Sequence, residues 1–228
     1  MKVSSDTLQV LKNFSSINTN IVFKPGDIIS TISSAKNIFA RAKIQEEIPN
    51  QFAVYDLNSL LAMISIVNDQ EVKFGDKSLQ ISSPAGMFEY FYSNPEVVTA
   101  APEGEIQHTE VYKFKLTAED VQMLMKAAAI TSAPTISITC NNQNVTMSVG
   151  DRKNKSANSF SRDLGSAFDQ FDIYIAVENL KVIPDAYDVS VAKTQKAKFL
   201  HFRHESKDLQ YWIAAEPGSN VWAKNIYG

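Results

Sequence analysis

The sequence contains little of what most catalytic and metal-binding sites are built from. It has one cysteine, Cys140, and three histidines among 228 residues. A single thiol cannot form an intramolecular disulfide or a zinc centre made of thiolates. Only eight glycines occur, and none belongs to a phosphate-binding loop or to a G-x-S-x-G nucleophile motif. These absences argue against an enzyme, and we expect no catalytic residue, no cofactor and no metal.

A basic excess and long apolar runs are also missing. The formal net charge is -3, whereas simple groove binders of nucleic acid are usually basic. Any DNA contact must therefore use a local patch or the topology of the protein. No apolar run approaches the roughly 20 residues that cross a bilayer. The amphipathic start, MKVSSDTLQVLKNF, lacks a secretory core, so we expect a cytosolic protein.

The remaining candidates for chemistry are scattered. His201 and His204 are three residues apart in a predicted strand, so they point to opposite faces and are poorly placed to share a metal. We expect them to be surface histidines. Cys140 ends another predicted strand and is more typical of a small core residue than of a nucleophile. Carboxylates such as Glu46 and Glu47 fall in predicted turns, where we expect solvated charges.

What is present is an internal repeat. Residues 2–17, KVSSDTLQVLKNFSSI, resemble residues 115–130, KLTAEDVQMLMKAAAI. In both copies a short apolar strand is expected to lead to a good helix N-cap, Ser4 or Thr117. An acid follows in the first turn, where it complements the helix dipole. A weaker echo relates residues 52–61 to 171–180, and each of these reads as a strand running into a helix.

Short alternating runs separated by turns fill the rest of the chain. They lie at 20–23, 28–33, 38–44, 71–74, 79–82, 87–92, 135–140, 144–149, 158–164, 187–192, 197–203 and 209–214. The pattern predicts two similar α+β domains, each with two helices packed on antiparallel sheets. We place them at 1–105, including a connector at 93–105, and at 106–228. The fourth helix should be short, because Pro184 stops it.

Three surface features allow more than one interpretation. The predicted outer faces of the repeated helices are small, polar and mildly basic, which suits either an ordinary solvated face or a surface that DNA passes. In the second copy of the repeated helix, residues 115–130, Met123 and Ile130 are expected on the apolar side. The basic segment 151–156 is either a solubilising turn or a contact for DNA or a loading protein. The chain end, with Trp222 and Tyr227, is a docking site or a packed terminus.

The segment 87–92, MFEYFY, is a dense aromatic strand. Phe88, Tyr90 and Tyr92 should share one face, while Met87 and Phe91 line the other. A free edge of this composition would favour aggregation. The strand is therefore expected either at the centre of a sheet or at a subunit interface.

In colinear order, these segments resemble the trimeric sliding clamps of tailed phages, which are related to the PCNA type. MKVSSDTLQVLKNFSSINTNIVFKPGD is similar to the family's first helix and hairpin, and FAVYDLNSLLAMISIVND to its second helix. NPEVVTAAP resembles the connector, LTAEDVQMLMKAA the third helix and ENLKVIPDAY the fourth. The resemblance implies a DNA clamp fold in which three chains form a ring with helices lining the hole.

The resemblance also implies partners and sites. The clamp would encircle duplex DNA and tether a DNA polymerase, after loading by a clamp-loader ATPase, in the cytoplasm of an infected host. The resemblance maps the family's DNA-facing positions to Lys12, Lys126 and Lys181, and we add Lys2, Lys153 and Lys155 as further DNA-facing candidates. The partner-peptide pocket comprises Val97, Val98, Ala215 and Pro217. The subunit interface comprises Phe88, Tyr90, Tyr92, Phe160 and Arg162. The alternatives are a virion structural protein forming a β-rich trimer and a small hydrolase, for which the sequence offers no cluster of acid–base groups.

Overall fold

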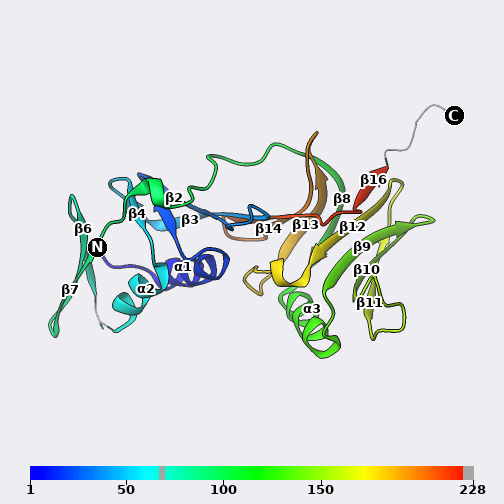
Figure 1. Ribbon diagram of the computed structural model, residues 1–228, viewed down its shortest axis with the longest axis horizontal. Helices are drawn as coiled ribbons and strands as arrows, with labels where there is room; N and C mark the ends of the chain where they lie inside the picture. The colour runs from blue at the N-terminus through cyan, green and yellow to red at the C-terminus, as the bar shows by residue number, and fades with distance from the viewer. Residues whose placement is uncertain (67–69, 223–228) are drawn as a thin grey trace. The chain divides into compact units, whose positions relative to one another are not determined.

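The computed structural model describes residues 1–66 and 70–222 (Figure 1). Backbone contacts divide the chain into two compact units. Unit 1 comprises Met1–Gly104 together with Lys207–Leu209, and unit 2 comprises Glu105–Ser206 and the chain from Gln210 onward. Three residues of the predicted second domain thus pack with unit 1, where the Lys43 amide donates to the Asp208 carbonyl at 2.8 Å. The domain limits 1–105 and 106–228 stay a prediction.

Unit 1 is built from two helices and short antiparallel sheets. Its elements are α1 Ser5–Ile17, β1 Ile21–Phe23, β2 Gly26–Ile32, β3 Ile38–Ile48, β4 Phe52–Val54, α2 Leu57–Ile66, β5 Glu71–Phe74, β6 Ser78–Ser83, β7 Gly86–Phe91 and the 3₁₀ turn η1 Pro95–Val97. β1 pairs with β4, β2 with β3, and β5, β6 and β7 form a three-stranded sheet. α1 and α2 lie side by side, and α1 packs on β2 and β3 (Figure 1).

A carboxylate from a strand distant in sequence holds the start of α1. Ser4 is the N-cap, as predicted, and its hydroxyl accepts a hydrogen bond from the Thr7 amide at 3.2 Å. Glu46 of β3 accepts short hydrogen bonds from the Ser4 amide and from the Thr7 hydroxyl. Burial raises the pKa of the Glu46 carboxyl, but these hydrogen bonds outweigh burial and bring the pKa below its ordinary value. The prediction that Glu46 is a solvated turn residue is wrong, because its β3 position leaves it 8% exposed.

Unit 2 repeats the plan with larger sheets. Its elements are β8 Thr109–Leu116, α3 Ala118–Thr131, β9 Thr135–Asn141, β10 Asn144–Gly150, β11 Phe160–Ser166, β12 Gln170–Ala176, the 3₁₀ turn η2 Val177–Asn179, β13 Tyr187–Lys193, β14 Lys198–His204, β15 Leu209–Ala214 and β16 Asn220–Trp222. One sheet has the order β11-β10-β9-β12-β16, and the other has the order β15-β14-β13-β8. α3 packs on β8 and β10.

The two copies of the repeat begin their helices by different means. In α3, Thr117 is the N-cap, and it forms a reciprocal capping box with Asp120. α1 carries Thr7 at the corresponding position, and Glu46 supplies the missing carboxylate from β3. The strand expected before α1 is absent from the described chain, and Met1 instead exchanges backbone hydrogen bonds with Val72.

The fourth helix predicted from the sequence is a single 3₁₀ turn, η2. The chain leaves helical geometry at Leu180, where ψ is 68°, and Pro184 prevents a helix from resuming across the next residues. Unit 2 therefore has one α-helix in its described residues, where the sequence predicted two. The predicted helix following Asp56 is confirmed as α2, and its expected last residue, Val67, lies outside the described residues.

Each unit has its own hydrophobic core. The largest fully buried side chains are Phe14, Ile21, Ile29, Ile38, Leu57 and Ile81 in unit 1, and Leu116, Leu124, Ile138, Phe171, Tyr187 and Tyr211 in unit 2. The Tyr187 hydroxyl donates to the Ile183 carbonyl at 2.7 Å, so this buried phenol is hydrogen-bonded, as buried polar groups usually are. Across residues 1–66 and 70–222, no helix is long and apolar enough to cross a membrane.

Candidate DNA-facing helices, subunit edges and a histidine cluster

The outward faces of the helices in unit 1 carry little charge. Lys12 is exposed on α1, together with the small polar residues Ser5, Gln9 and Ser16. α2, LNSLLAMISI, has no Lys or Arg at all. Lys2 is also exposed and precedes α1. This surface can attract a phosphate backbone only weakly, and its small polar side chains offer little to read a base sequence.

α3 in unit 2 presents a more apolar face than the sequence indicated. Lys126 is exposed as expected. Met123 and Ile130, however, are 51% and 83% exposed, so their predicted place on the buried side is wrong. The buried stripe of α3 is narrow and consists of Val121, Leu124, Ala127 and Ala128. Two small alanines face the sheet at the end of this stripe, which leaves the larger side chains outside.

The other proposed cations of unit 2 lie outside the α-helix. Lys181 is half-buried directly after η2. Lys153 and Lys155 are exposed in the loop that joins β10 to β11. Their neighbour Arg152 is anchored, because its guanidinium lies 3.4 Å from the centre of the Tyr174 ring and donates to the Pro217 carbonyl at 3.4 Å.

Two strands lie at sheet edges. β7 is an edge strand of β5-β6-β7, and β11 is an edge strand of the five-stranded sheet. In the described part of the chain, neither has a partner strand on its outer side. Of the two alternatives for the aromatic segment, the centre of a sheet is therefore wrong for the single chain. Unpaired edges of this length invite pairing with another chain.

The exposed side chains of β7 are not the ones that were expected at the subunit interface. Tyr92, just after the strand, stacks on Phe52 with ring centres 4.7 Å apart, and the Tyr90 hydroxyl lies 3.3 Å from the Asp56 backbone. Phe88 is 36% exposed, whereas Met87 and Phe91 are 60% and 67% exposed. The two residues expected on the opposite face are thus the ones most open to a neighbouring subunit.

β11 carries the other two residues of the expected interface. Phe160 is half-buried at its start. Arg162 makes a short ion pair with Asp120, the capping residue of α3. Burial raises the pKa of the Asp120 carboxyl, but hydrogen bonds from Thr117 and Arg162 outweigh it, so the pKa lies below its ordinary value. Arg162 therefore connects the edge strand to the start of α3.

The expected pocket residues lie in two places. Ala215 and Pro217 line an open hollow of about 460 Å³ in unit 2, together with Lys193–Lys198. Val97 is 61% exposed on η1 in unit 1, and Val98 is buried against Val22 and Ala53. In the chain end, Trp222 closes β16 and is 48% exposed, while Tyr227 lies outside the described residues.

His201 and His204 are buried, and the prediction that they are surface histidines is wrong. His201 and His204 are 2% and 7% exposed, because β14 runs between β13 and β15. The Nε2 atom of His204 lies 3.0 Å from a carboxylate oxygen of Asp185. His201 instead stacks on Trp212 and meets His108 edge-on, with ring centres 4.7 and 4.8 Å apart.

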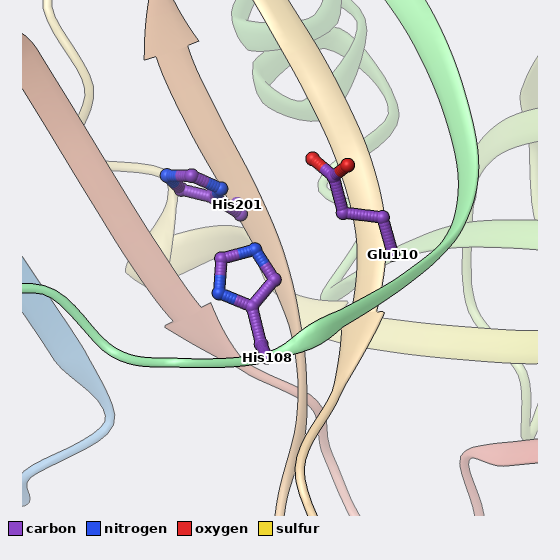
Figure 2. A group of neighbouring side chains, drawn as sticks. All are labelled: His108, Glu110 and His201. Carbon is purple, nitrogen blue, oxygen red and sulfur yellow. The ribbon is translucent and has the colours of Figure 1, made fainter.

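His201 also meets a residue pair that the sequence reasoning missed. His108, Glu110 and His201 each place one donor atom within 4.8 Å of the others (Figure 2). The sequence does contain a signal for His108 and Glu110, because residues two apart in a strand face the same side of the sheet. The third comes from β14, and only the pairing of β8 with β13 and of β13 with β14 brings it near.

Comparisons with known proteins agree with this architecture. The family model described as DNA polymerase processivity factor matches residues 4–86, and the one described as gp45 sliding clamp, C terminal, matches residues 113–217. The sliding clamp of Vibrio phage KVP40 is 30% identical over 224 residues, covering 95% of this chain and 99% of the relative. The sliding clamp of Escherichia phage RB69 is 30% identical over 232 residues, covering 96% and 98%.

A solved structure shows the same fold. The proliferating cellular nuclear antigen of Entamoeba histolytica aligns with a TM-score of 0.65 and 14% identity, covering 92% of this chain and 94% of the other. The two units, the helices and the antiparallel sheets thus define a DNA clamp fold. The chain belongs to the family of phage sliding clamps, the processivity factors of DNA polymerases. The expected sliding-clamp function in DNA replication is confirmed, and proteins of this family act without catalysing a reaction.

Proposed function

We propose that three copies of this chain close into a ring around duplex DNA and that the ring performs no chemistry itself. The observation that carries this proposal is the pair of open antiparallel edges, β7 in unit 1 and β11 in unit 2. Pairing β7 of one copy with β11 of the next is a head-to-tail contact, and such contacts give a ring when the rotation closes. Phe88, Tyr90, Tyr92, Phe160 and Arg162, with Met87 and Phe91, belong to this interface.

The ring would hold DNA by enclosure more than by attraction. The net charge is -3, and α2 has no cation. We assign the DNA-facing positions to Lys12, Lys126, Lys181, Lys2, Lys153 and Lys155. Isolated lysines near phosphates give a weak, salt-sensitive and sequence-independent attraction, which allows a ring to slide.

The tether works through effective concentration. A polymerase bound to a ring that cannot leave the duplex stays near the primer end without a tight DNA contact of its own. We place its docking peptide, and those of other clamp users, at Val97, Val98, Ala215 and Pro217. A closed ring also requires an ATP-dependent loader to open it, and the site of action is the cytoplasm of the infected host cell.

Primer extension on circular and on linear DNA tests the proposal. With the cognate polymerase, a loader and ATP, long products on a primed circle are expected only when this protein is present. On linear DNA the gain should be smaller, because rings slide off the ends. Product lengths that are independent of the protein would refute the proposal, and stable association with virus particles instead would favour the structural alternative.

The DNA-facing assignment predicts the effect of neutralising three cations. The triple variant Lys12→Gln, Lys126→Gln and Lys181→Gln should remain assembled but should lose DNA-stimulated loader activity and ring retention at moderate salt. The slope of log affinity against log salt should fall by about 1 for each phosphate contact removed. Retention on nicked circles across a salt series measures this slope.

The matched control is a second triple variant with the same change in charge. Lys36, Lys73 and Lys77 are exposed and lie outside the helices, so Lys→Gln at these three positions should leave the slope unchanged. Equal losses in both variants would mean that total charge matters and that the assignment of Lys12, Lys126 and Lys181 is wrong.

A further inference from the structure

We propose that His108, Glu110 and His201 form a binding site for a divalent transition-metal ion of the Zn²⁺ type in unit 2. Their donor atoms lie within 4.8 Å of one another, so a single point lies within about 2.8 Å of all three. Zinc binds nitrogen and oxygen at roughly 2.0–2.2 Å, and side-chain shifts of under about 1 Å would close the site. Figure 2 shows the two rings and the carboxylate converging from separate segments.

A backbone contact fixes the protonation of His108 for this role. Its Nδ1 lies 2.5 Å from the Ile106 carbonyl oxygen. A carbonyl oxygen only accepts hydrogen bonds, so Nδ1 carries a proton, and in the neutral imidazole Nε2 then keeps its lone pair. Histidines that bind metals usually donate their other N–H to a carbonyl or carboxylate in this way, which fixes both tautomer and ring orientation.

A chain of hydrogen bonds fixes His201 in the same sense. The Gln210 amide nitrogen donates to the Glu105 carboxylate at 2.8 Å, which sets the orientation of the amide because a carboxylate accepts only. The Gln210 oxygen therefore faces His201 Nε2 at 2.9 Å, and Nε2 must carry the proton. In the neutral imidazole the lone pair is then on Nδ1. Both histidines thus keep an unprotonated ring nitrogen, and each has a hydrogen-bond acceptor behind the other nitrogen.

The charge state of the cluster suits a cation. The Glu110 carboxylate pairs with the Lys113 ammonium, so it offers an anionic oxygen donor. Two imidazoles and one carboxylate match zinc, and also iron, nickel and copper, better than they match calcium or magnesium.

The expected affinity for the metal ion depends on its access to the site and on the nearby positive charges that compete with it. Glu110 and His201 line an open hollow of about 370 Å³, which gives an ion a path to the site. Lys113 and Arg203 line the same hollow, and their charges oppose a cation. The Lys113 ammonium pairs with Glu110, but the Lys113 side chain is 65% exposed, so the ammonium can turn toward water when a metal takes its place. We therefore expect micromolar binding, with the ion linking the segment before β8 to β14.

Metal titration of the isolated, untagged protein tests the site without DNA or polymerase. After treatment with a chelator, Co²⁺ should produce visible d–d absorption bands that saturate at one ion per chain, and Zn²⁺ should abolish them. Zn²⁺ should also raise the melting temperature. His108→Ala and Glu110→Gln should each weaken Zn²⁺ binding by at least tenfold. His108 is half-buried and Glu110 is 28% exposed, so both variants should fold.

Two matched controls and one positioning variant sharpen the result. His204→Gln and Glu205→Gln change the same residue types outside the cluster and should bind Zn²⁺ like the parent protein. Glu105→Gln lets the Gln210 amide turn over and should weaken binding by about 10–100-fold, the usual cost of losing a partner behind a ligand. Absence of the Co²⁺ bands, or parental Zn²⁺ affinity in His108→Ala, would overturn the proposal. Neither result would affect the clamp function.

Discussion

The variant Met87→Asp with Phe91→Asp is expected to convert the assembled ring into single chains of 25.3 kDa. Both side chains project from the open edge strand β7 and are 60% and 67% exposed in the single chain. Burying such a side chain in an interface is worth about 1.5–3 kcal/mol, and placing a carboxylate there adds a cost of desolvation. Together the two changes should weaken each contact by at least about a thousandfold.

Light scattering coupled to size-exclusion chromatography measures this effect. The parent protein should elute at three times the mass of one chain and the variant at the mass of one chain. Far-UV circular dichroism should be unchanged, because neither side chain belongs to the core of unit 1. Primer extension on circular DNA should lose its long products together with the assembly.

The control for this experiment is Ile130→Asp. Ile130 is 83% exposed on α3, so the substitution adds one carboxylate, half the charge that the β7 variant adds, at an apolar surface position that is not on a sheet edge. It should leave the mass of the assembly unchanged. Dissociation by Ile130→Asp, or survival of the ring in the β7 variant, would show that β7 does not form the subunit contact.

The second large effect is expected at Glu46. Glu46→Ala removes the acceptor for the Ser4 amide and the Thr7 hydroxyl. A buried donor left without a partner costs about 1–3 kcal/mol, so the free energy of unfolding should fall by about 2–5 kcal/mol. Glu46→Gln retains one acceptor oxygen and should cost less. Urea unfolding at one fixed protein concentration measures both variants.

Glu47→Ala is the matched control, because Glu47 is the next residue on β3 and is exposed on its other face. It should change the stability by less than about 0.5 kcal/mol. Equal effects of Glu46→Ala and Glu47→Ala would contradict the role of Glu46 as the cap of α1.

The Glu46 carboxyl also predicts how stability depends on pH. Its folded pKa lies below the ordinary value of 4.5, so the charged form is favoured in the native state. This contribution is complete above the unfolded pKa and is lost as the pH falls through the folded pKa. The stability gap between the parent and Glu46→Gln should therefore be constant above about pH 5.5 and should narrow below about pH 4.5. A gap that stays constant down to pH 3 would contradict this linkage.

The two copies of the repeat show where the sequence was sufficient. Ser4 and Thr117 were both predicted as N-caps, and both are, because a cap depends on side chains within a few residues of the helix start. The same local logic placed Lys12 and Lys126 on exposed faces. The prediction from the local pattern was wrong for Met123 and Ile130, because helical periodicity alone does not show how wide a stripe of the α3 surface the sheet will cover.

The sequence by itself determined the helix starts, because these depend on short-range hydrogen bonding. It also determined the duplication and the family, because both were found from similar segments that occur in the same order along the chain. The tertiary structure alone decided that Glu46 of β3 caps α1, that β7 and β11 are left as open edges, and that His108 and Glu110 meet His201. These features depend on which strands pair and which do not. Strand order is set by the packing of residues far apart in the chain, and no local pattern of residues encodes it.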